Sequence, residues 1–383
     1  TNVNIKNKLN LDHFFERNSK QYPFVSTKEI STYLHNENHL ITQVLINEAI
    51  INDKIFEVYN LTDLDKDLVI SKEKISIASL PVLNEARSDF YEFMQASSEF
   101  PLSGIKSYID FLPTYDFSID EIESIENEFH SLYQKNNSLE EFCIRNELNP
   151  INVWYWFKKS NTLPKQKVNK LSFEYLADVI KEILNDDEDG IIPIVSNAGE
   201  KILLDRVEEK FIKRGFSMAQ YSGFDSVLGR PIKDFIDNHF FTELTECLNL
   251  FMYMPKTPFV WHLTSGPEQG FDCYISIYKW SRDNLMRIRS VYIEHRERAL
   301  MNRQSDLANK ESVDAQNEKD KIFKQLKEIE AFKVKIDELL EEGYDPILDD
   351  GVGKNIAPLQ QKKMLAYDVL NAGQLKKFLN ADW

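Results

Sequence analysis

One long stretch of the chain lacks both residues that most often interrupt helices. Residues 271–342 contain no glycine or proline, and residues 281–342 are rich in charged and aliphatic side chains. Apolar residues repeat near a heptad at Ile322, Leu326, Ile329, Ile336 and Leu340, with Phe332 just off it. Such a seam is typical of helices that pack along their length. We therefore predict long helices over 281–342, either as an intramolecular hairpin or as a coiled coil that docks a partner.

The rest of the chain also favours helix, with one short β region. There are only 12 glycines and 13 prolines in 383 residues, so we expect few long irregular stretches. Capping boxes at Ser118 and Ser138 mark helix starts. Residues 258–263 and 271–280 alternate around the turn-rich segment 264–270, which predicts a β-hairpin. The expected fold class is mainly α (α+β), with helical domains, a helix-turn-helix-like element, a small β-hairpin or sheet, and a long C-terminal helical hairpin or coiled coil.

Changes in pattern and charge divide the chain into five segments. They are an N-terminal helical region (1–135), a helix-turn-helix-like region (136–190), an α+β region with the hairpin (191–280), long helices or coiled coil (281–342) and a C-terminal tail (343–383). Residues 41–59 carry apolar side chains near helical spacing, and 191–195 are suited to a buried strand.

A short helix, a tight turn and a second helix are expected between residues 138 and 160. Ser138 and Glu141 form the capping box, Asn146–Asn149 is the turn, and Pro150 occupies a favoured first helical position. Lysines follow at the end of the second helix. This spacing is that of a helix-turn-helix, a motif that many DNA-binding proteins use.

The charge balance weighs against nucleic acid unless the positive charge is segregated. The formal net charge is −16, whereas duplex-binding proteins usually carry a basic surface. Residues 154–170 hold five lysines and no acid, and residues 279–303 hold seven Lys or Arg against three acids. The sequence therefore contains two basic stretches within an acidic whole.

The first basic stretch gives one set of candidate DNA-binding residues. They are Asn152, Trp156, Lys158, Lys159, Lys165 and Lys167. Lysines suit phosphates, an amide suits a groove edge, and we expect Trp156 to be freer to contact a ligand than Trp154 or Phe157. The alternative is a core helix with buried aromatic residues and solvated lysines.

The second basic stretch gives a regular arginine series. Its members, spaced by seven, are Arg282, Arg289, Arg296 and Arg303. On one long helix this spacing places four guanidinium groups on one face, where they are suited to follow a phosphate backbone. The alternative is an exposed helix whose charges are balanced by Glu294, Glu297 and neighbouring acids.

We find no catalytic, cofactor or metal motif in the sequence. No Pro-Pro pair exists to form the loop with which amine methyltransferases hold a flipped base. Gly351–Lys354 matches neither a P-loop nor a dinucleotide fingerprint. His35 and His39 have no evident third metal ligand, and His262 is better explained as a structural histidine. We therefore assign no catalytic, cofactor-binding or metal residue.

Three widely spaced cysteines, no run of 18 apolar residues and no signal-peptide core indicate a cytoplasmic protein without a membrane partner.

Several long strings resemble one family in the same order along the chain. They are residues 55–69, 139–164, 189–195, 227–241, 249–266, 274–293 and 344–360. Together they resemble the C-terminal half of the adenine-specific DNA methyltransferases of BREX phage-defence systems (PglX-like). The resemblance covers most of the chain from about residue 41 onward.

The resemblance implies a region without the chemistry of methyl transfer. In that family the methyltransferase domain, which binds S-adenosylmethionine, precedes the region matched here. The partners implied are that missing domain, double-stranded DNA and other BREX proteins.

Two functions follow as expectations. The first is a non-catalytic DNA-recognition and scaffold region of an adenine-N6 methyltransferase. The second is a protein-interaction module that docks other defence-system subunits without touching DNA. Salt-dependent binding of duplex DNA separates the two.

Overall fold

The computed structural model describes residues 27–73, 75–96, 102–132, 138–160, 162, 164–247 and 258–380. These residues are mostly helical with one three-stranded antiparallel sheet, so the predicted fold class is confirmed. The chain forms two compact units, Thr1–Leu171 (unit 1) and Ser172–Trp383 (unit 2). This division falls inside the segment 136–190 that the sequence analysis treats as one region. The predicted boundary at 135/136 lies outside the described residues.

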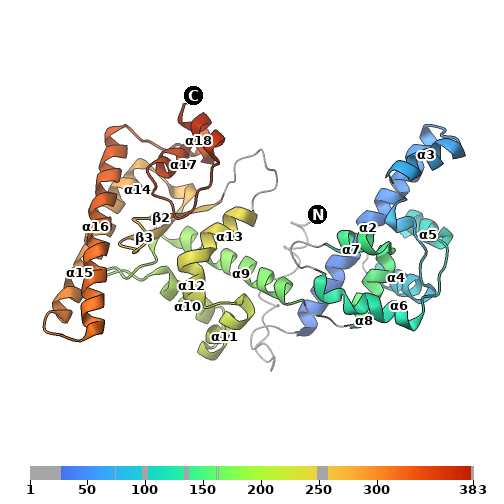
Figure 1. The fold of residues 1–383 in the computed structure, drawn as a ribbon, viewed down its shortest axis with the longest axis horizontal. Coiled ribbons are helices and arrows are strands. Elements are labelled where there is room, and N and C mark those ends of the chain that lie inside the picture. Colours follow the sequence, from blue (N-terminus) through green and yellow to red (C-terminus); the bar gives the residue numbers. More distant parts are fainter. Residues whose placement is uncertain are drawn as a thin grey trace. The chain divides into compact units, whose positions relative to one another are not determined.

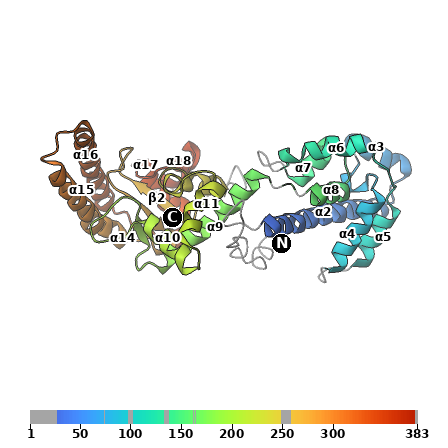
Figure 2. The same ribbon diagram turned by 90° about the horizontal axis from the view of Figure 1, so that it is seen from below.

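Unit 1 is a bundle of helices around one long helix. Its elements are α2 (Thr27–Val58), α3 (Asp63–Glu73), η2 (Ile77–Ser79), α4 (Asn84–Ala96), α5 (Leu102–Phe111), α6 (Ile119–Asn127), η3 (Phe129–Ser131), α7 (Leu139–Asn146) and α8 (Pro150–Ser160). Helices α7 and α8 and the short η2 pack against α2, and α4 packs against α8. Figures 1 and 2 show α2 running through the unit, with α3 beyond its C-terminal end. The division between the units falls within α9 (Lys165–Asp186).

The predicted helix starts are present. Ser118 and Glu121 form a complete capping box at α6, and the Ser138 side chain accepts from the Glu141 amide at the start of α7. These bonds satisfy amide donors that have no partner within the helix.

The helix-turn-helix connection is also present, but its second helix is buried. Helix α7 ends at Glu147, which adopts the left-handed conformation (φ 51°), and α8 begins at Pro150. Every residue of α8 from Pro150 to Phe157 is buried. A DNA-reading helix has to present a face to the groove, so α8 is a core helix of unit 1 rather than a recognition helix.

Unit 2 combines a small sheet with surrounding helices. Its elements are β1 (Ile191–Pro193), α10 (Leu203–Lys213), α11 (Met218–Leu228), α12 (Ile232–Asp234), a π-helical turn (Phe235–His239), α13 (Phe240–Cys247), β2 (Val260–Thr264), β3 (Asp272–Ser276), η6 (Ile277–Lys279), α14 (Arg282–Arg287), a π-helical turn (Ile288–Tyr292), α15 (Ile293–Leu307), α16 (Val313–Glu341), η8 (Leu348–Asp350), α17 (Val352–Gln361) and α18 (Ala372–Leu379). The strand order is β1-β3-β2, with both neighbours antiparallel to β3. The predicted hairpin is thus β2–β3.

Residues 281–342 form an intramolecular helical hairpin, the first of the two predicted alternatives. Helices α15 and α16 lie side by side (Figure 1), joined by residues 308–312. The buried positions of α16 after its first turn are Ile322, Gln325, Ile329, Phe332, Ile336 and Leu339. This 3-4-3-4-3 spacing is a heptad seam. Its phase differs from the predicted one, because Phe332 lies in the seam whereas Leu326 and Leu340 flank it.

No helix among the described residues is long and apolar enough to cross a membrane.

Candidate functional site

Two residues of the predicted DNA-binding set lie in the core of unit 1. The Asn152 side chain accepts from the Leu83 amide (2.8 Å) and donates to the Pro81 carbonyl (3.1 Å). Trp156 is 2% exposed and meets Phe117 edge to face, with ring centroids 4.9 Å apart. The expectation that Trp156 is free to contact a ligand is therefore wrong, because its indole fills the interior.

The two lysines in the last turn of α8 are engaged with acids of the same unit. Lys158 pairs with Asp89 (3.1 Å), and Lys159 pairs with Glu85 (3.6 Å).

Further along, Lys167 lies 2.7 Å from Glu37, and Lys165 is exposed at the start of α9. Three of the four predicted lysines, Lys158, Lys159 and Lys167, are thus paired with carboxylates that compete with a phosphate for the same cations.

The members of the arginine series bind other parts of unit 2. Arg282 donates to the Leu340 carbonyl at the end of α16. Arg289 forms a forked pair with Asp337, and Arg303 forms one with Glu318. Three of the four guanidinium groups therefore join α14–α15 to α16.

Arg296 points from α15 toward the β2–β3 loop and residue 196. It is 5% exposed, and its donors reach the Gly270 carbonyl (2.7 Å), the Ser196 carbonyl (2.9 Å) and the Gln269 carbonyl (3.4 Å). Burial lowers the pKa of Arg296 to about 10. A guanidinium in this position is unavailable to a phosphate, so its assignment as a DNA contact is corrected to a structural role.

Unit 1 also contains a partly apolar groove that the sequence analysis did not predict. Its volume is about 600 Å³, and it lies between α2, the end of α3, η2 and α5. The lining residues are Ala49, Asn52, Asp53, Phe56, Val69, Ile70, Ile75, Ser76, Ser79, Tyr108, Phe111, Leu112 and Pro113. We call this feature the unit 1 groove.

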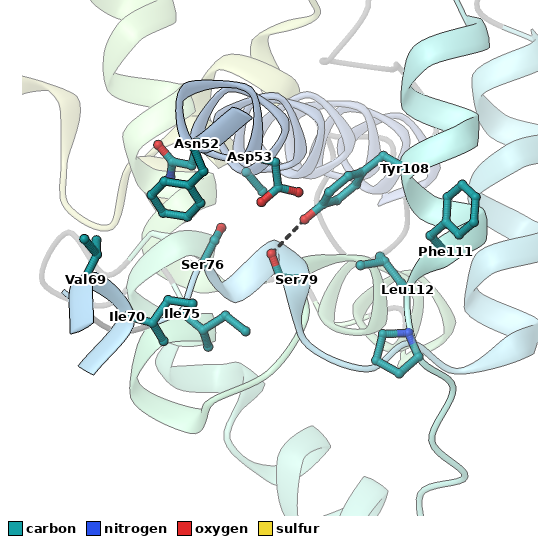
Figure 3. A pocket seen from close by; sticks show the side chains of 13 residues that line it. Asn52, Asp53, Val69, Ile70, Ile75, Ser76, Ser79, Tyr108, Phe111 and Leu112 are labelled. Atoms are coloured by element: carbon teal, nitrogen blue, oxygen red, sulfur yellow. Dashed lines mark hydrogen bonds between the residues drawn. The ribbon is translucent and has the colours of Figure 1, made fainter. Parts of the chain in front are cut away.

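The unit 1 groove has apolar side chains on two sides and polar side chains between them (Figure 3). Val69, Ile70 and Ile75 lie on one side, and Phe111 and Leu112 lie on the other. Four oxygen-bearing side chains occupy the middle: Asp53, Ser76, Ser79 and Tyr108.

Within this polar centre Ser79 and Tyr108 share a hydrogen bond of 2.7 Å between their hydroxyl oxygens. Burial raises the pKa of Tyr108, and the nearby negative charge of Asp53 adds to that shift.

Asp53 is the charged group of the unit 1 groove. Its pKa is raised above the ordinary value, first by burial and then by the negative charge of Glu57; Lys66 and Lys54 partly offset this. No ion pair joins Asp53 to another residue of the described part of the chain. Asp53 is an exposed residue, so water as well as the two lysines stabilises its carboxylate.

Exposed apolar side chains form part of the lining of the unit 1 groove itself. They are Val69 (37%), Ile70 (36%), Ile75 (47%) and Phe111 (89%). Single exposed apolar residues are ordinary, but several that line one hollow mark an interaction surface. Other exposed apolar residues of α2 and α3, such as Ile51, Val58 and Leu64, do not line the groove.

A second hollow, in unit 2, contains the predicted structural histidine. The ring of His262 is 3% exposed and lies 3.1 Å from the Asp272 carboxylate, which also accepts from Thr264 (2.9 Å). Burial raises the pKa of Asp272. Each of these polar groups has a partner, as a structural cluster requires. Among the residues that the structure describes, no group of three metal-ligating side chains is close enough to hold an ion.

Comparison with known proteins adds no family: no family model matches the chain, and no curated protein matches it. The methyltransferase resemblance therefore stays a prediction.

Proposed function

We propose that this chain is a non-catalytic protein-docking and scaffold region that uses the unit 1 groove to bind a partner. This is the second of the two functions that the sequence predicts. The observation that carries it is the groove with four exposed apolar side chains in its lining, Val69, Ile70, Ile75 and Phe111, since such a surface is stabilised by burial against another protein.

The same geometry weighs against the first function, DNA recognition through the predicted residues. Of those residues, two are in the core and the buried Arg296 binds carbonyls, while others pair with carboxylates. A phosphate would have to displace those acids in a chain with a net charge of −16. Binding to DNA releases counterions only where cations are free to replace them.

The resemblance to BREX methyltransferases suggests which partners to test. They are the methyltransferase domain that the family places before this region and the other BREX subunits. In this proposal the chain holds such a subunit in place, and the methyl-transfer chemistry with S-adenosylmethionine belongs to the separate domain.

The proposal is tested by mixing the intact chain with each purified BREX subunit, and with the methyltransferase domain, and measuring complexes by calorimetry. We expect at least one complex that Phe111→Asp abolishes and that Ile119→Asp leaves unchanged. Both side chains are highly exposed, at 89% and 75%, but only Phe111 lines the groove. Complexes that tolerate Phe111→Asp, or no complex with any subunit, would contradict docking at this groove.

A further inference from the structure

We infer that the unit 1 groove accepts an amphipathic helix whose contact face carries apolar side chains at both ends and a lysine or arginine between them. This inference rests on the docking function proposed above and adds the chemical class of the partner. It is argued from the dimensions of the groove, its two apolar sides and its acidic centre.

One wall of the unit 1 groove is formed by successive turns of α2. On α2 the lining residues are Ala49, Asn52, Asp53 and Phe56, which are spaced i, i+3, i+4 and i+7. At a rise of about 1.5 Å per residue this wall is about 10 Å long, or two helical turns. A partner helix that presents side chains at i, i+3 or i+4, and i+7 spans the same length.

Both sides of the unit 1 groove require apolar contacts. Ile70 and Ile75 on one side are 36% and 47% exposed, and Phe111 on the other is 89% exposed. Figure 3 shows these residues on opposite sides of the polar centre. An occupant gains free energy by covering both sides, so its apolar side chains belong at the two ends of its contact face.

The centre of the unit 1 groove favours a cation. Asp53 is exposed to water there and has no ion pair with another described residue, so an occupant that covers the groove would remove this water. Burying a carboxylate without a counter-charge is unfavourable. A lysine or arginine is suited to this position, because its aliphatic stem crosses apolar surface while its charged end reaches the carboxylate.

Charge around the unit 1 groove favours the same partner. Between residues 47 and 72 there are six acids, Glu48, Asp53, Glu57, Asp63, Asp65 and Asp67, against three bases, Lys54, Lys66 and Lys72. This excess attracts a basic segment and repels phosphate groups of a nucleic acid or an anionic membrane. A protein helix therefore fits the surface better than either polyanion.

The test is a selection of helical peptides, randomised on one face, against the intact chain. Peptides are kept if they bind the unchanged chain and the Ile119→Asp control but fail to bind Phe111→Asp. We expect the retained peptides to be enriched in Lys or Arg at one position flanked by apolar residues. Dissociation constants are then measured for the most frequent peptide and for its version with Glu at that position.

We expect the Glu version to bind the unchanged chain about tenfold or more weakly, as for loss of a partly buried ion pair. Asp53→Asn should remove this preference, and Asp53→Lys should reverse it. Glu123→Gln removes one charge from an exposed position on α6 outside the groove, so it should leave both constants unchanged. Circular dichroism of each variant establishes that the helices are intact.

Three results would overturn the inference in distinguishable ways. Groove-dependent peptides without a cation, or equal binding of the Lys and Glu versions, would leave docking in place and remove the charge selection. A preference that survives Asp53→Asn would assign the cation to another acid. No groove-dependent peptide at all would remove the docking function together with the inference.

Discussion

Arg296 illustrates how a side chain that looks suited to DNA acts within the protein. Its guanidinium ties α15 to the β2–β3 loop and to Ser196 through carbonyl oxygens. Arg303, seven residues later, is 49% exposed and pairs with Glu318. The same residue type at heptad spacing therefore has two different environments.

Replacing these two arginines by alanine should have unequal effects on folding. Arg296→Ala removes the donor to the buried Gly270 carbonyl and to the part-buried Ser196 and Gln269 carbonyls, and should cost about 2–4 kcal/mol of unfolding free energy. Arg303→Ala breaks a solvent-exposed pair and should cost less than about 1 kcal/mol. Urea unfolding of both variants measures the difference, and equal losses would contradict the structural role of Arg296.

His39 provides a pH-dependent contribution to unit 1. Its ring lies against Phe90, Phe93 and Trp154, with centroids 4.6, 4.6 and 5.9 Å away. Burial lowers the pKa of His39 to about 4. The folded state holds the neutral ring, so its contribution to stability is complete above the unfolded pKa of 6.5 and is lost as the pH falls toward 4.

Unit 1 should therefore become less stable between pH 7 and pH 4.5. We expect His39 to account for about 1–2 kcal/mol of that loss, and His39→Leu to remove this part. Urea unfolding of the unchanged chain and of His39→Leu at both pH values tests it. Parallel losses in the two proteins would show that His39 is not the group that titrates.

At the scale of elements, the β2–β3 loop is held closely against α16. The Glu328 carboxylate accepts from the amides of Glu268 (2.9 Å) and Gly270 (3.2 Å). A Cβ atom at Gly270 would lie 2.5 Å from the Gln325 carbonyl oxygen. Glycine is therefore required there by the backbone of the neighbouring helix.

Two Gly→Ala substitutions should change stability in opposite directions. Gly270→Ala forces the loop away from α16 and should cost about 1–3 kcal/mol. Gly104 lies on α5, and a Cβ atom added there would have no atom of a neighbouring element within 4 Å. Gly104→Ala should therefore stabilise the protein by about 0.5 kcal/mol. Thermal unfolding measures both signs, and a neutral Gly270→Ala would contradict the close approach.

The elements themselves were largely predictable from local chemistry. Capping serines, Pro150 and the glycine-free stretch mark helix ends and lengths, and the alternating strings mark β2 and β3. The phase of the α16 seam could not be predicted from the sequence. Leu326, Phe332 and Leu340 are all apolar, and only tertiary packing selects which of them is buried. For the same reason sequence alone left the hairpin and the coiled coil as alternatives.

The prediction of the DNA-binding residues was wrong because it took no account of tertiary contacts. Lysines at the end of α8 and arginines on α14–α15 are local patterns, but their partners lie far away in the chain. Lys158 meets Asp89, and Arg289 meets Asp337. The unit 1 groove was missed because residues of α2, α3 and α5 form it together, and no single segment carries a motif for it.

At the scale of the whole molecule, acidic side chains form ion pairs with many of the basic side chains that were predicted to contact DNA. Unit 1 pairs Lys158, Lys159 and Lys167 with Asp89, Glu85 and Glu37, and unit 2 uses three arginines to join α14 and α15 to α16. Most of the cations predicted to contact DNA are thus held by the fold, while apolar side chains remain exposed on α2 and α3.

Binding of the intact chain to a labelled DNA duplex, measured by fluorescence anisotropy over a series of salt concentrations, tests this account most directly. We predict no saturable binding even at low salt, about 50 mM, and no change on replacing Lys158 and Lys159 by glutamine. Tight binding that weakens steeply with salt and is reduced by those substitutions would contradict it, because it would place free cations on the protein surface.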